Sequence, residues 1–115
     1  MSESKHSAII QFDGKDYTLE FSRRTAVEAQ KRGFRALDLG DPNKMLAAVL
    51  DLFQYSFLMH HPELDIEDID KILDEGLGGT ISTELLERLS DSYGDSLSSL
   101  VTEGESKNGR ATVIL

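Results

Sequence analysis

The first structured segment of the chain reads Ser7-Ala8-Ile9-Ile10-Gln11-Phe12-Asp13-Gly14-Lys15-Asp16-Tyr17-Thr18-Leu19-Glu20-Phe21. It predicts a β-hairpin, because Asp-Gly suits a type I′ turn, in which both central positions need a positive φ. Tyr17, Leu19 and Phe21 alternate with polar residues, so the second strand has one apolar face. An isolated hairpin is marginally stable in water. We therefore expect this face to pack on helices or on another subunit.

A short helix is predicted over residues 25–32, directly after the hairpin. Thr25 and Glu28 match a capping box, in which the Thr25 hydroxyl accepts from the Glu28 N–H. Gly33 is the usual left-handed residue after a helix. Five basic residues surround this helix: Arg23, Arg24, Lys31, Arg32 and Arg35. The last turn suits cations, whereas Arg23 and Arg24 precede the helix and are candidates for contact with a partner.

A second helix is predicted over residues 42–60, with Asp41 as N-cap and Pro42 at the first helical position. Proline at position 62 ends it, because the residue before proline avoids helical geometry. Two apolar stripes follow helical spacing. The first comprises Leu46, Val49, Leu50, Phe53 and Phe57, and the second comprises Met45, Leu52, Tyr55 and Met59. The second stripe is either ordinary core or an adaptable surface that exchanges partners.

Two further helices complete one α+β domain over residues 7–103. Asp65 caps a helix over residues 66–75, whose apolar face holds Ile66, Ile69, Ile72 and Leu73, and the glycines at 76, 78 and 79 end it. Helical periodicity continues over residues 83–103. The expected architecture is an N-terminal hairpin packed on a small bundle of three to four helices. Residues 1–6 are expected to be disordered, and residues 104–115 to form a flexible tail with the apolar ending Ala111–Leu115.

Length and charge narrow the function classes. A chain of 115 residues suits one domain, and the absence of cysteine indicates a reducing compartment. No window approaches the run of about 18 apolar residues that spans a bilayer, and the polar start shows no secretory signal. Residues 1–35 carry seven Lys/Arg and five Asp/Glu, whereas residues 36–115 carry five and sixteen. Such an acidic body disfavours binding to nucleic acid.

The uneven charge leaves three interpretations open. The basic start and the acidic remainder attract each other between subunits of a homo-oligomer, or they meet complementary patches on another protein. In the third interpretation the charges only keep the protein soluble.

Motifs for chemistry are missing from the sequence. His60 and His61 are adjacent, so on a helix they point about 100° apart and do not share a metal; a place near the helix end explains them better. The acidic run from Asp65 has Asp70 where a calcium loop needs glycine and Gly76 where it needs glutamate. We expect no metal, no cofactor and no catalysis.

The sequence resembles the tail assembly chaperones of long-tailed bacteriophages of Gram-positive hosts. One matching run is Phe12-Asp13-Gly14-Lys15-Asp16-Tyr17-Thr18-Leu19-Glu20-Phe21-Ser22-Arg23-Arg24-Thr25, followed by a short helix ending Gly33-Phe34. The other is the apolar helix Leu50-Asp51-Leu52-Phe53-Gln54-Tyr55-Ser56-Phe57-Leu58-Met59-His60-His61-Pro62. The likeness covers residues 8–75.

The resemblance implies a factor of the host cytoplasm that is absent from the mature virion. It would bind the tape measure protein, recruit the tail tube protein and promote tube polymerisation, and a longer frameshifted form would be made beside it. Two alternatives from other classes remain. One is an acidic interaction module such as an antitoxin or a DNA-mimic inhibitor, and the other is a metal-dependent enzyme that uses His60 or His61.

Overall fold

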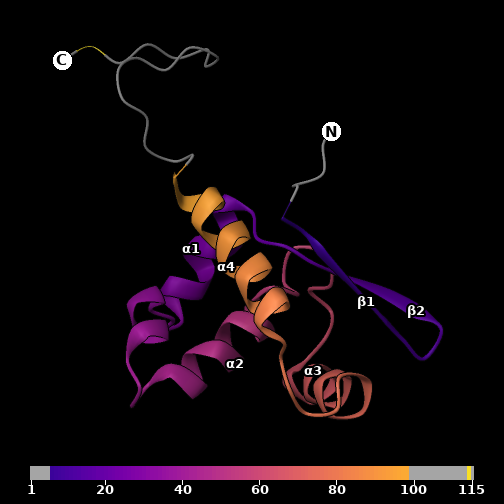
Figure 1. Cartoon of the computed structure of the whole chain (residues 1–115). Helices are drawn as coiled ribbons and strands as arrows, with labels where there is room; N and C mark the ends of the chain where they lie inside the picture. Colours follow the sequence, from indigo (N-terminus) through magenta and orange to yellow (C-terminus); the bar gives the residue numbers. More distant parts are fainter. Residues whose placement is uncertain (1–5, 99–113, 115) are drawn as a thin grey trace.

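The computed structural model describes residues 6–98 and residue 114 (Figure 1). This part of the chain has an α+β fold, in which an antiparallel hairpin precedes four α-helices, as the sequence predicts. The elements are β1 (Ala8–Phe12), β2 (Lys15–Leu19), α1 (Arg23–Lys31), the 3₁₀ helix η1 (Ala36–Gly40), α2 (Met45–Tyr55), α3 (Ile66–Lys71), the π-helical turn η2 (Ile72–Gly76) and α4 (Thr83–Ser98).

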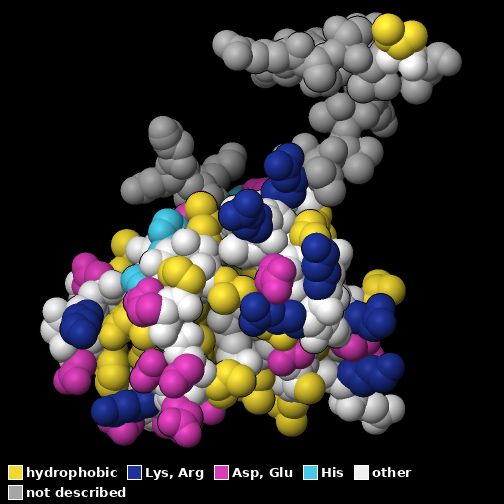
Figure 2. Space-filling model, turned by 180° about the vertical axis from the view of Figure 1, so that it is seen from behind, with side chains coloured by type: hydrophobic (Ala, Val, Ile, Leu, Met, Phe, Trp, Pro, Cys, Tyr) yellow, Lys and Arg dark blue, Asp and Glu magenta, His cyan; other side chains and the backbone are white. Residues whose placement is uncertain are grey.

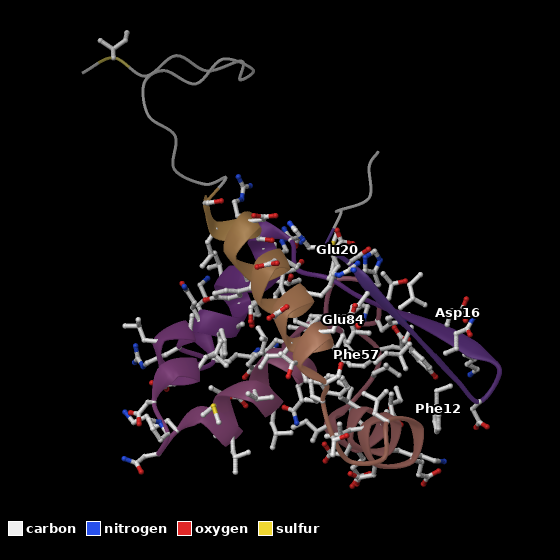
Figure 3. All side chains as sticks on the ribbon, viewed as in Figure 1. Phe12, Asp16, Glu20, Phe57 and Glu84 are labelled. Atoms are coloured by element: carbon white, nitrogen blue, oxygen red, sulfur yellow. The ribbon has the colours of Figure 1, made fainter. Side chains whose placement is uncertain are left out.

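The hairpin has the predicted turn. Ala8 lies opposite Leu19 and Phe12 lies opposite Lys15. Asp13 and Gly14 have φ angles of 57° and 79°, which is the pair of positive values that a type I′ turn requires. At the tip of the hairpin, Phe12 lies beside the coil of α3 and η2 (Figure 3).

Helix α1 begins earlier than predicted, and its cap is different. Ser22 is the N-cap, and its hydroxyl accepts from the Thr25 N–H at 3.2 Å. A second, reciprocal hydrogen bond completes the cap: the Thr25 hydroxyl accepts from the Ser22 N–H at 3.0 Å. The predicted Thr25–Glu28 box is therefore wrong, because Thr25 occupies the third helical position. Gly33, with a φ of 108°, follows the helix as expected.

Helix α2 is shorter than the predicted range 42–60. Asp41 is not its cap: the Asp41 carboxylate accepts from the Asn43 N–H at 2.9 Å and closes a turn before the helix. The helix ends at Tyr55 because the Ser56 hydroxyl donates to the Phe53 carbonyl at 2.6 Å, and the N–H groups of Phe57 and Leu58 donate to carbonyls three residues back rather than four. The Ser56 carbonyl accepts from the Glu20 N–H at 2.9 Å, which joins this turn to the hairpin. Residues 56–60 form successive turns.

Glycine and aspartate shape the second half of the fold as predicted. The Asp65 carboxylate accepts from the Asp68 N–H at 2.9 Å and caps α3. Gly78 and Gly79, with φ angles of 72° and 81°, follow η2. Helix α4 is described to Ser98, so residues 99–103 of the predicted helix lie outside the described residues. The predictions for residues 1–5 and for the tail, apart from residue 114, also lie outside them.

The core fills the space between the hairpin and the helices, and helices of the same chain cover the apolar face of the hairpin. The Phe21 N–H donates to the Ser92 hydroxyl at 2.9 Å, and the Ser96 hydroxyl donates to the Phe21 carbonyl at 2.7 Å. The hairpin therefore packs on helices of its own chain. The buried apolar residues are Ile10, Leu19, Phe21, Ala26, Ala29, Phe34, Ala48, Leu52, Phe53, Phe57, Ile69, Ile72, Leu73, Leu89 and Tyr93.

Histidines join the hairpin to the rest of the fold. His60 Nε2 lies 2.8 Å from Glu20 Oε1, and His61 Nε2 accepts from the Thr18 N–H at 2.9 Å. His6, in the segment predicted to be disordered, lies 2.9 Å from the Asp95 carboxylate of α4. The expectation that His60 and His61 cap the second helix is wrong, because α2 ends five residues before His60.

Candidate protein-interaction surface

The second apolar stripe of the sequence does not form one surface. Leu52 is 0% exposed and belongs to the core, since α2 packs on α1 and α4. Met45 at the start of α2 is 43% exposed, and Met59, beyond its end, is 40% exposed. Tyr55 is half-buried. The prediction of Leu52 as a surface residue is therefore wrong, and the remaining three lie at separate places.

The first apolar stripe is also divided. Phe53 and Phe57 are buried, whereas Leu46 is 77% exposed and Leu50 is exposed as well. Leu46 and Leu50 lie on the outward side of α2. No other described element covers that side at the N-terminal end of the helix.

Tyr55 lines a groove between the end of α2 and the start of α3. The groove has a volume of about 450 Å³ and a mainly apolar floor. We name it the α2–α3 groove, and its lining is Arg32, Gln54, Tyr55, Leu58, Leu64, Asp65, Ile66, Glu67 and Ile69. The lining combines apolar side chains with the guanidinium of Arg32 and the carboxylates of Asp65 and Glu67.

The local sequence explains why this groove is open. Helix α2 stops at Tyr55, and the chain then turns through residues 56–64 before Asp65 caps α3. Ile66 occupies the first position of α3 and is 61% exposed, whereas Ile69, one turn later, is buried. The prediction that Ile66 faces the core is wrong, because no described element packs over the first turn of α3.

Electrostatics keep the Tyr55 phenol neutral at physiological pH. Burial raises the pKa of Tyr55 above its usual 10.0, and the Asp51 carboxylate raises it further. Arg32 acts in the opposite direction but is itself paired with Glu28, with 2.8 Å between Nε and Oε2. Burial also raises the pKa of Asp51. The phenol is therefore available at the groove as a hydrogen-bond donor and acceptor.

Arg23 and Arg24 lie apart from the groove. Together with Val27, Glu28 and Lys31 they line a shallow depression of about 400 Å³ on α1, which we name the α1 basic face. Within residues 6–98, neither arginine has a carboxylate within ion-pairing distance. Lys and Arg side chains are concentrated on the right side of the view in Figure 2, and Asp and Glu side chains at its lower left.

Sequence reasoning found Tyr55 but missed Leu58, Leu64 and Ile66 of the groove. Leu58 was absent from both stripes, and Leu64 stands alone between the Pro62 turn and α3. The available signal was Leu64 directly before the cap residue Asp65, together with Ile69 at the fourth helical position, since these two positions often pack on each other.

Neither a metal-binding cluster nor a membrane-spanning helix is present among the described residues. Residues 6–98 hold no group of three or more His, Asp or Glu side chains placed to bind one metal ion. No helix in the same range combines the length and the apolar character that crossing a bilayer requires. The histidines are instead engaged by Glu20 and by the Thr18 N–H.

These features define a small α+β protein that offers an apolar groove and a separate basic face. Over residues 1–114 the chain matches the family model described as "Domain of unknown function (DUF5055)", and it belongs to that family. No curated protein and no solved structure matches the chain.

Proposed function

We propose that this protein is a tail assembly chaperone of a long-tailed bacteriophage of a Gram-positive host. It binds the tape measure protein, recruits the tail tube protein and promotes tube polymerisation in the host cytoplasm, without entering the mature virion. The likeness of residues 8–75 to such chaperones supports this proposal. The single structural observation that carries it is the open α2–α3 groove.

The groove suits a helical partner. A tape measure protein is long and helical, and an amphipathic helix inserts side chains spaced three or four residues apart into an apolar groove. A volume of about 450 Å³ accommodates a few such side chains. Asp65 and Glu67 in the lining favour a helix that carries basic residues beside its apolar side.

The size of the surface suits a contact that is made and released. A chaperone must leave the tape measure protein when the tube forms around it, so each contact has to be weak. Among the lining residues, Ile66 is the one large apolar side chain that is strongly exposed, at 61%. Contacts of small area are typical of transient complexes. Many copies along one tape measure protein would still hold it, because linked weak contacts add avidity.

The acidic segment over residues 63–75 favours a second candidate, an inhibitor that mimics DNA. This segment carries seven carboxylates and one lysine. Such a protein would bind a basic nucleic-acid-binding protein through these charges. It would not depend on the apolar groove, which distinguishes the two candidates.

The test is co-expression with a tape measure protein of a related phage, followed by size-exclusion chromatography with light scattering. We expect a defined soluble complex. Ile66→Ser should reduce the recovered complex several-fold, and Ile9→Ser is the matched control, since Ile9 is 63% exposed but lies on β1 away from the groove. A tape measure protein that stays insoluble, or equal losses for both variants, would contradict the proposal.

A further inference from the structure

The α1 basic face is an unneutralised surface on an otherwise acidic protein. Its outward residues include Arg23, Arg24 and Lys31, which have no carboxylate partner within the described residues. Glu28, in the same depression, is already paired with Arg32. The opposite side of α1 is buried through Ala26 and Ala29. The helix is therefore fixed on the body and presents to the exterior three cations that have no carboxylate partner among residues 6–98.

An acidic strip of matching form lies on α3 and η2. Glu67, Asp70 and Asp74 are exposed and follow each other at spacings of three and four residues, which places them along one side. The other side of these elements is buried through Ile69, Ile72 and Leu73. We name the three carboxylates the acidic strip.

The two surfaces agree in length as well as in charge. Arg24 to Lys31 and Glu67 to Asp74 each span seven residues, which is about 10 Å along a helix. They do not meet within one molecule. Figure 1 shows α1 and α3 on different sides of α2 and α4, and no ion pair joins them in the described part of the chain.

We infer that the acidic strip of a second copy of this chain docks on the α1 basic face. The chain carries a net charge of −9, so two copies repel each other on average. At about 0.15 M salt the Debye length is about 8 Å, so the distant charges are screened while facing charges attract. Val27, between the cations, adds an apolar contact at the centre of the face. This inference specifies the self-association expected of the proposed chaperone, but it needs no tape measure protein.

Because the two surfaces differ and lie on different sides of the molecule (Figure 1), one pair of copies does not make both contacts at once, and the contact is head to tail. Each copy that docks through its acidic strip leaves its own basic face free for the next copy. The assembly therefore grows with protein concentration into an open chain, or closes into a ring when the rotation between copies permits. A simple two-fold dimer is not the expected end state.

The test measures self-association of the full chain by sedimentation equilibrium over a range of protein and salt concentrations. One variant carries Arg23→Glu with Arg24→Glu, and the other carries Asp70→Lys with Asp74→Lys, which avoids Glu67 of the α2–α3 groove. We expect each variant to associate at least about tenfold more weakly than the wild type, because like charges then face each other. High salt should also weaken the wild-type association.

Mixing the two variants gives the decisive result. In the mixture the reversed faces are again complementary, so we expect association to return. Matched controls carry the same net charges at other places: Lys15→Glu with Lys44→Glu, and Glu84→Lys with Glu87→Lys. They should associate like the wild type. Circular dichroism checks that each variant folds. If a double variant does not fold, a single substitution in the same surface replaces it. This is Lys31→Glu for the α1 basic face and Asp74→Lys for the acidic strip.

Several results would overturn this inference. They are a monomeric wild type at every concentration, wild-type association of both face variants, or a mixture that stays monomeric. Binding to the tape measure protein is measured separately on the same variants. If the wild type associates but binds no tape measure protein, the head-to-tail contact stands and the proposed function fails.

Discussion

Replacing Ser92 by alanine removes one hydroxyl from the centre of the fold. Ser92 lies on α4 and is buried, and its Oγ accepts from the Phe21 N–H at 2.9 Å. Phe21 follows β2 directly and is itself buried. In the Ser92→Ala protein, this N–H is therefore left in the interior without an acceptor.

The expected cost follows from that unpaired group. A buried donor without a partner costs about 1–3 kcal/mol. The better helix propensity of alanine offsets about 0.5 kcal/mol, which leaves a net loss of about 0.5–2.5 kcal/mol. For a domain of this size, about 4–8 °C is lost for each kcal/mol. Urea unfolding followed by circular dichroism measures the free energy of unfolding, and hydrogen exchange measures protection of the Phe21 amide.

Ser90→Ala is the matched control. Ser90 is in the same helix, and its hydroxyl bonds no group in the described part of the chain. Both variants gain the same propensity, so the difference between their unfolding free energies isolates the bond to Phe21. Equal stabilities, or unchanged protection of the Phe21 amide, would refute this reasoning and show that another acceptor serves the N–H.

Three further predictions concern other parts of the fold. Leu52→Ala should cost about 2–5 kcal/mol of unfolding free energy because the side chain is fully buried, whereas Leu46→Ala should change it by no more than about 0.5 kcal/mol; urea unfolding of both checks this. Gly94→Ala should raise the melting temperature, since nothing lies within 4 Å of the added Cβ and alanine favours a helix by about 1 kcal/mol; an unchanged or lower value would contradict it. Because burial raises the pKa of Asp51, the protonated form favours folding, and that contribution is lost as the pH rises above the usual value of 3.8. Asp51→Asn should therefore be more stable than the wild type at pH 7 in urea unfolding, with the gain shrinking as the pH falls toward 3.8.

Local chemistry made the hairpin turn, the end of α1 and the start of α3 predictable. The Asp13-Gly14 turn depends on two backbone angles that few other residue pairs adopt, and Gly33 and Asp65 act on their immediate neighbours. The first cap was harder to place. Ser22 and Thr25 both bear hydroxyls, and they lie three residues apart, so either fits an N-cap until the strand end before Ser22 is known.

The remaining features depend on contacts between residues far apart in the sequence, which local sequence patterns do not predict. At the end of α2 the Ser56 hydroxyl donates to the Phe53 carbonyl, and the Ser56 carbonyl accepts from the Glu20 N–H of the hairpin segment, which is distant in the sequence. Helical periodicity shows that two sides of α2 are apolar, but it does not show which side a neighbour covers. For that reason the stripe that holds Leu52 and Tyr55 stayed open between core and surface, and Ile66 was placed on the apolar face of its helix although it is 61% exposed.

The bonds between the hairpin and α4 also govern the order in which the chain folds during synthesis. Ser96, which donates to the Phe21 carbonyl, is made 75 residues after its partner. At about 5–20 residues per second, the ribosome needs about 4–15 s to cover that interval. Until then residues 56–61 can cover the strand after the turn, but the side of Phe21 that meets α4 stays open. A chain interrupted before α4 would keep that side of Phe21 exposed, so premature termination yields a fragment destined for aggregation or proteolysis.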